Sequence, residues 1–163
     1  MLSITIAAAA SLIAFNTMTL TPPRVVANGS VANVVAAIDH LASARAALAA
    51  GAFDDARREF AAAAAVDREA GRLPVEASTG LAYTLFAQQY DREAAYILSR
   101  LAADAANAGN AEVEAKALLD VVWLNVQNGQ RAEARENGLR LRELCDKNLV
   151  SAETRQAIKR RIG

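Results

Sequence analysis

Chemically reactive side chains are scarce in this chain of 163 residues. The one cysteine, Cys145, excludes an intramolecular disulfide and a cysteine-based metal cluster, and its helical spacing from Leu141 and Leu144 favours a buried apolar role. The one histidine, His40, lacks the neighbouring nucleophile and orienting group that nucleophilic catalysis needs. The sequence also has no phosphate-binding glycine loop and no His-x-x-x-His pair. We therefore expect no enzymatic activity, no cofactor and no bound metal.

An excess of charge of either sign is also lacking. The chain has 18 basic and 18 acidic residues, so no long-range field would attract nucleic acid or an anionic membrane. The basic residues between Arg135 and Lys147 alternate with acidic ones, which is typical of an ion-paired helix surface. The basic residues from Lys159 to Arg161 are too few to bind nucleic acid alone. Neither nucleic acid nor a membrane is an expected partner.

Residues that favour sheets and turns are few. Aromatic residues make up 5% of the chain, and there are 8 glycines and 3 prolines. Alanine is abundant, hydrophobic residues reach 53% and charged residues 22%, which favours long helices around a folded core over disorder. The composition and length predict one all-α domain.

Residues 1–27 differ from the rest of the chain. An uncharged apolar run from Ile4 to Phe15 is followed by Pro22 and Pro23, and Val25 and Ala27 suit a cleavage site. The run has the length of a signal-peptide core and falls short of the roughly 20 residues of a membrane span. No basic residue precedes it, so an apolar N-terminal helix or a misassigned start codon is the alternative. We expect a signal peptide at 1–27, a periplasmic or secreted protein without a membrane span after cleavage, and otherwise a cytoplasmic one.

The stretch from Leu48 to Ala63 predicts one helix end, one tight turn and one helix start. Gly51 supplies the left-handed conformation that ends a helix, and Asp54 or Asp55 can cap the next helix. Helical spacing places the small and large residues Ala56, Phe60 and Ala63 on one face. The pattern Leu48-x-x-Gly51-x-Phe53-x-x-Ala56-x-x-x-Phe60-x-x-Ala63 resembles the core of a tetratricopeptide (TPR) repeat.

The same unit recurs downstream. Gly51, Gln89 and Gly129 are about 39 residues apart, against 34 in a TPR unit, and a regular interval indicates a stack of equal units. Gly80 and Tyr83 resemble the Gly-x-x-Tyr segment of TPR first helices, where a residue without a side chain lets a neighbouring helix approach. The resemblance implies an α-solenoid of three antiparallel helical hairpins plus a C-terminal capping helix, within a domain at 28–163. Related helical-hairpin solenoids fit the same pattern. Ser30, Asn110 and Ser151 are expected to cap the starts of three helices. The expected helices run from Ser30 through Leu48, from Phe53 to Ala70, from about Pro74 to Gln88, through Ala94 and Ala105, from Asn110 to the turn at Asn128 and Gly129, through Ala132 and Leu144, and from Ser151 to about Ile162.

In TPR-like arrays one face of the first helices lines a concave groove, and the resemblance places Arg45 and Trp123 at equivalent positions on it. Trp123 also lies between Val122 and Leu124, so a core position is an equal alternative. Leu41 and Arg45 replace the lysine and asparagine of carboxylate-clamp TPRs, so binding of chaperone C-terminal tails is not expected. The expected peptide-binding groove consists of Leu41, Arg45, Leu48, Leu81, Leu85, Lys116, Leu119, Trp123 and Val126.

This mixed apolar and basic groove predicts a non-enzymatic scaffold that binds a protein or an amphipathic or acidic peptide. The alternative is a structural subunit that self-associates in a homo-oligomer or an envelope assembly. Sedimentation separates the two, because an obligate oligomer uses its surface for itself while a monomer leaves its groove open to a partner.

Overall fold

The computed structural model describes residues 31–162, and this part of the chain is all-helical. The all-α class predicted from the alanine-rich composition is confirmed. The predicted signal peptide at 1–27 and the predicted cap Ser30 lie outside the described residues. The helices are α1 (Val31–Ala49), α2 (Phe53–Glu69), α3 (Val75–Ala87), α4 (Asp91–Asn107), α5 (Ala111–Gln127), α6 (Arg131–Asp146) and α7 (Ala152–Ile162).

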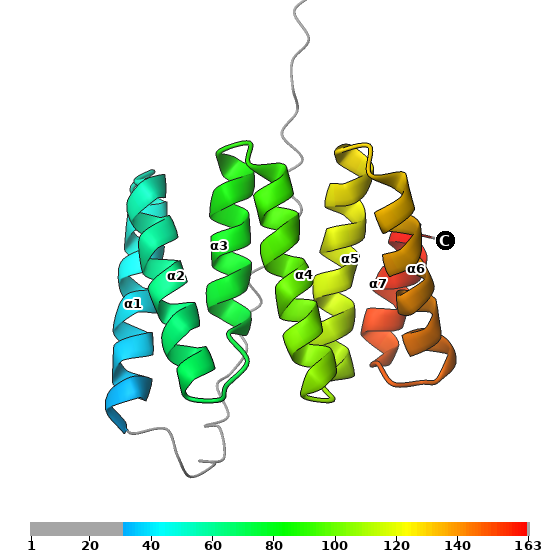
Figure 1. Ribbon diagram of the computed structural model, residues 1–163, viewed down its shortest axis with the longest axis horizontal. Helices are drawn as coiled ribbons and strands as arrows, with labels where there is room; N and C mark the ends of the chain where they lie inside the picture. Colours follow the sequence, from blue (N-terminus) through cyan, green and yellow to red (C-terminus); the bar gives the residue numbers. More distant parts are fainter. Residues whose placement is uncertain (1–30, 163) are drawn as a thin grey trace, which may run out of the picture.

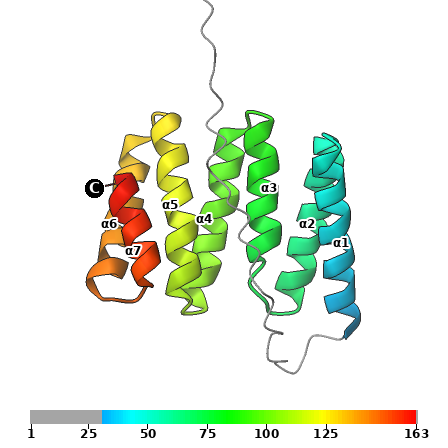
Figure 2. The same ribbon diagram turned by 180° about the vertical axis from the view of Figure 1, so that it is seen from behind.

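The helices form a row in which contacts join mainly those that follow one another in the chain (Figure 1). Successive helices run in opposite directions, and α7 packs on both α5 and α6. Seen from behind, α1, α3, α5 and α7 lie on the near side (Figure 2). On the other side, an ion pair joins α2 to α4, where Arg68 Nε is 3.2 Å from Asp104 Oδ2. The row therefore has an odd-helix face (α1, α3, α5, α7) and an even-helix face (α2, α4, α6).

One turn geometry joins all consecutive helices of the described part. After α1, the Gly51 N–H donates to the Leu48 carbonyl at 3.0 Å and the Ala52 N–H donates to the Ala47 carbonyl at 2.9 Å. This pair of bonds is the Schellman motif, which needs a residue with positive φ just after the helix. The same pair recurs after each helix up to α6. The residues with positive φ are Gly51 (73°), Gly71 (68°), Gln89 (66°), Gly109 (68°), Gly129 (73°) and Asn148 (54°).

Two helices begin with the side-chain caps that the sequence predicts. The Asn110 Oδ1 accepts a hydrogen bond from the Val113 N–H at 3.1 Å at the start of α5. The Ser151 Oγ accepts one from the Thr154 N–H at 3.1 Å at the start of α7. Each bond satisfies an amide that has no partner within its helix.

The predicted capping of α2 by Asp54 or Asp55 is wrong. The N-cap position belongs to Ala52, which makes no side-chain cap bond, and α2 begins at Phe53. Both aspartates therefore lie in the first helical turn, where their charge still favours the helix dipole. Asp54 Oδ1 is 3.3 Å from the Arg57 Nη2, so these carboxylates serve surface ion pairs instead.

The core between the first helices is organised by Phe60 of α2, whose exposed fraction is 2%. A Cβ atom on Gly80 of α3 would lie 2.4 Å from atoms of the Phe60 ring, so only glycine leaves room for the ring there. The close helix approach predicted at Gly80 is thus confirmed. A first core cluster spans α1 to α5 and a second spans α4 to α7, ending at Val150 and Ile158.

Helix α1 is long and apolar enough to cross a membrane by length and composition alone. It packs along α2, burying Ala37 and Ala44 completely or nearly so. Only 11% of the most apolar stretch of this helix is buried, so much of α1 is apolar and exposed.

Candidate functional site

The predicted groove residues all belong to α1, α3 and α5, on the odd-helix face. They do not form one continuous exposed surface. Leu81, Leu85 and Leu119 are each no more than 8% exposed and belong to the two core clusters. Leu41 and Leu48 are half-buried against the first cluster, whereas Arg45, Lys116 and Val126 are exposed.

Arg45 connects two helices of the odd-helix face. Its guanidinium donates to the Glu76 carboxylate in the first turn of α3. Both side chains are about half exposed, so the pair contributes little to stability but occupies the charge of Arg45. Binding of an acidic ligand at Arg45 would therefore have to displace Glu76.

Trp123 lies at the boundary between core and surface. Its ring meets Phe86 of α3 edge to face, with 5.4 Å between the ring centroids and 69° between the planes. It packs against the first core cluster while part of the indole stays accessible. The sequence left open whether Trp123 is a groove residue or a core residue, and the side chain is partly buried in the core and partly exposed.

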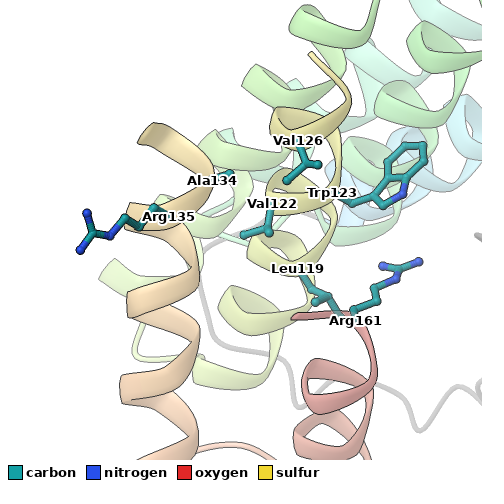
Figure 3. A pocket seen from close by; sticks show the side chains of 7 residues that line it. All are labelled: Leu119, Val122, Trp123, Val126, Ala134, Arg135 and Arg161. Carbon is teal, nitrogen blue, oxygen red and sulfur yellow. The ribbon is translucent and has the colours of Figure 1, made fainter. Parts of the chain in front are cut away.

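A pocket of about 350 Å³ opens beside Trp123, between α5, α6 and α7 (Figure 3). Its apolar floor comes mainly from one face of α5, and two arginines border it. Figure 3 shows Arg161 extending from the end of α7 to the same side as the indole, while Arg135 points away from α5. The pocket is lined by Leu119, Val122, Trp123, Val126, Ala134, Arg135 and Arg161.

The pocket lies beside the last turn of α7. This helix has 11 residues, whereas α5 has 17 and α6 has 16. Its first turn is fixed beside the start of α5, and its last turn reaches only Asp120, whose Oδ1 is 2.8 Å from the Arg161 Nη1. Within residues 31–162, no helix covers the pocket side of the second half of α5 and the first turn of α6.

Glu112 of α5 fixes the start of α7. Its carboxylate accepts hydrogen bonds from the Ser151 N–H at 2.9 Å, the Ser151 hydroxyl at 3.1 Å and the Thr154 hydroxyl. The Lys116 Nζ lies 3.1 Å from the same carboxylate. Burial alone would raise the pKa of Glu112, but these hydrogen bonds outweigh it and lower the pKa to about 2. Glu112 therefore stays ionised while it holds α7 in place.

The charge near the pocket is unevenly compensated. Burial raises the pKa of Asp120, although its hydrogen bond with Arg161 acts in the opposite direction. Within residues 31–162, Arg135 makes no ion pair. The pocket lining contains no acidic residue.

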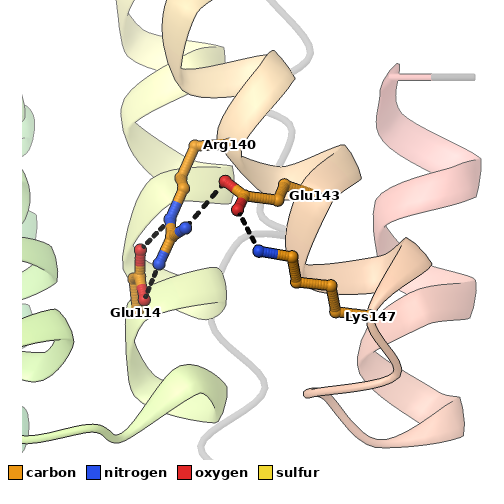
Figure 4. Close-up of polar contacts among 4 residues, drawn as sticks. All are labelled: Glu114, Arg140, Glu143 and Lys147. Atoms are coloured by element: carbon orange, nitrogen blue, oxygen red, sulfur yellow. Dashed lines mark hydrogen bonds and ion pairs between the residues drawn. The ribbon is translucent and has the colours of Figure 1, made fainter.

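A polar network next to this region holds α6 against α5 (Figure 4). The Arg140 Nε donates to Glu114 at 2.6 Å, and its Nη1 donates to Glu143 at 2.7 Å. Glu114 is only 5% exposed, so this guanidinium compensates a nearly buried carboxylate. The hydrogen bonds from Lys147 and Arg140 lower the pKa of Glu143 to about 2, and those to Glu114 and Glu143 raise the pKa of Arg140. Each charge has a partner, so the network has a structural role.

The residues weighed for catalysis have structural partners. The His40 Nδ1 is 2.7 Å from the Glu59 Oε2, which joins α1 to α2. Cys145 packs against the second core cluster. No group of three or more His, Cys, Asp or Glu side chains in the described residues could hold a metal ion.

No family model, curated protein or solved structure matches the chain. The assignment of function therefore depends on the geometry of the chain itself.

Four pocket residues were missed by the sequence analysis, namely Val122, Ala134, Arg135 and Arg161. Val122 and Ala134 carry the apolar spacing of core residues, and each arginine belongs to a segment of mixed charge. No local pattern signals that these four residues share one pocket, because the pocket depends on where α7 packs along α5.

Proposed function

We propose that the chain is a TPR-like α-solenoid that binds protein segments and performs no chemistry. Its units are the hairpins α1/α2, α3/α4 and α5/α6, and α7 closes the end. The repeated Schellman turn, the packing of consecutive helices and the separation into two faces support this proposal. The pairing of His40 with Glu59 and the packing of Cys145 favour binding over catalysis.

The pocket between α5, α6 and α7 is the observation that carries the binding role. An apolar floor bordered by arginines suits a short amphipathic helix with apolar residues on one face and an acidic residue beside them. Helix α7 is an example of such packing within the chain, because its Ile158 is buried in the second core cluster, to which the pocket residues Leu119 and Val122 also belong. The proposed ligand extends this packing along the uncovered part of α5.

A displayed library of random peptides, selected on the full chain, tests this proposal. We expect enriched peptides to carry apolar residues three and four positions apart together with an acidic residue. Val126→Glu alters an exposed pocket residue and should weaken their binding by about 10- to 100-fold. Arg135→Glu should weaken it less, because Arg135 borders the pocket while its guanidinium points away from α5.

Two matched variants serve as controls for that experiment. Leu139→Glu changes an equally exposed apolar residue of α6 that does not line the pocket, and Arg131→Glu changes an exposed arginine of the same helix. Both should retain affinity. If no peptide is enriched, or if enriched peptides bind Val126→Glu as well as the unaltered chain, the pocket is not the binding site.

We further propose that the protein works in the cell envelope or periplasm after removal of residues 1–27. The uncharged run from Ile4 to Phe15 motivates this proposal. Intact-mass measurement of the protein from its native cell should give a chain that begins near residue 28. Recovery of the full-length chain from the cytoplasm would reject export.

A further inference from the structure

The outward side of α1 is apolar along the whole helix. Val31, Val35 and Ile38 are 80%, 50% and 58% exposed. The helical spacing continues this strip through three exposed alanines, Ala42, Ala46 and Ala49. The opposite side of α1 buries Ala37 and Ala44 against the rest of the row. A helix that is apolar on both sides is normally covered on both sides.

The two ends of the row differ in this respect. At the other end, the outward side of α7 carries the exposed polar residues Glu153, Gln156, Lys159 and Arg160. Stacked helical repeats need a polar outer face at each end to remain soluble. Helix α7 has such a face and α1 does not.

We infer that the outward strip of α1 packs against the same strip of a second copy of this chain. A row with one apolar end and one polar end can join only through its apolar ends. This contact is isologous and closes after two copies, so it gives a two-fold dimer and no filament. The dimer is a double-length row whose two outer ends are both α7. This surface is at the opposite end of the row from the pocket, so the two proposals can fail separately.

The order of side chains along α1 is self-complementary. If two α1 helices pack antiparallel about an axis near Ala42, Ile38 lies opposite Ala46 of the second copy, and Val35 lies opposite Ala49. Each of these two large side chains then meets a small one, as close helix packing requires, whereas Val31 extends past the end of the facing helix. Asp39, which is exposed beside the strip, stays at the solvated margin of this contact. A bilayer would instead have to bury this carboxylate in the middle of the helix.

Sedimentation of the full chain tests the inference. The unaltered chain should sediment as a dimer at micromolar concentration, and Ile38→Glu should raise the dissociation constant at least about a hundredfold, because the dimer would bury two carboxylates. Circular dichroism should show equal helicity, since Ile38 is exposed in the single chain. Leu139→Glu, with 56% exposure on α6, is the matched control and should remain dimeric.

Cross-linking tests the register with a variant that preserves the apolar strip. In a Cys145→Ala background, Ala42→Cys should form a disulfide-linked dimer on mild oxidation, whereas Ala46→Cys should form much less, because its counterpart in the second copy is Ile38. A chain that is monomeric at all concentrations overturns the inference. So does loss of helicity in monomeric Ile38→Glu, which would show that the chain covers this strip itself. Flotation of the unaltered chain with neutral phosphatidylcholine vesicles would assign the strip to a membrane and also overturn it.

Discussion

Gln89 has the same left-handed backbone as the glycines at the corresponding turns, with φ of 66°. A side chain in this conformation costs free energy that glycine avoids, in part offset by the greater freedom of glycine in the unfolded chain. We expect Gln89→Gly to raise the free energy of unfolding by about 0.5 to 1 kcal/mol, measured by urea denaturation.

Gly129→Ala is the reciprocal control for this turn effect. Gly129 has φ of 73°, and a Cβ atom added there would have no other atom within 4 Å. Only backbone strain therefore opposes the substitution. It should lower the free energy of unfolding by about 1 kcal/mol. A stabilised Gly129→Ala or a destabilised Gln89→Gly would show that the turn geometry does not govern these positions.

Phe60 fills the space left by Gly80, so its removal should leave a cavity between α2 and α3. Phe60→Ala should cost about 3 to 5 kcal/mol of unfolding free energy. Tyr96→Ala, at a side chain 65% exposed on α4, should stay within about 0.5 kcal/mol of the unaltered chain. A Phe60→Ala thermal midpoint within about a degree or two of the unaltered value would contradict the packing.

At the scale of residues, the sequence predicts those features that depend on neighbouring residues alone, such as turns and helix spacing. Gly51 and Gly129 mark turns because few other residues adopt positive φ, and Gly80 and Phe60 were both placed by spacing. Asp54 was misassigned as a cap because Ala52 takes that position, and no local preference for alanine signals it. Cap identity there follows from the Schellman turn before the helix, which fixes where the chain re-enters helical geometry.

The ionised carboxylate of Glu112 holds the start of α7 against α5, in addition to the burial of Ile158 and the Arg161–Asp120 hydrogen bond. Because the folded pKa of Glu112, about 2, lies below the ordinary value of 4.5, its contribution is full above about pH 4.5 and disappears as the pH falls toward 2. At neutral pH, Glu112→Gln should lower the free energy of unfolding by about 1 kcal/mol. The difference from the unaltered chain should shrink below pH 4.5, as measured by urea titrations across the acid range.

Glu153→Gln provides the control for this element, because Glu153 is an exposed residue in the first turn of α7. It should produce little change at any pH. A difference between Glu112→Gln and the unaltered chain that stays constant from neutral pH to pH 2 would mean that the charge of Glu112 does not hold α7.

At the scale of elements, the helix ranges could be predicted but the pocket could not. Asn110 and Ser151 cap their helices, and these signals are encoded next to each helix. The pocket arises from where the end of α7 falls along α5, which depends on long-range bonds such as Arg161 to Asp120. Sequence spacing assigned Leu81 and Leu85 to the peptide-binding groove without indicating that both are buried in the first core cluster.

For the whole molecule, the row of consecutive contacts underlies both proposed surfaces. If each helix depends mainly on its neighbours, the pocket at one end and the α1 strip at the other form independently. A bundle with a shared core would instead transmit any core defect to every helix. The row of consecutive contacts therefore predicts that a core defect destabilises mainly the helices close to it.

Hydrogen exchange of Phe60→Ala, followed helix by helix with mass spectrometry, measures that spread most directly. We expect amide protection to fall strongly in α1, α2 and α3, which surround the lost ring, and to stay near that of the unaltered chain in α6 and α7, which have no residue in the core cluster that contains Phe60. An equal loss of protection in all helices of the described part would contradict a stack of locally supported units.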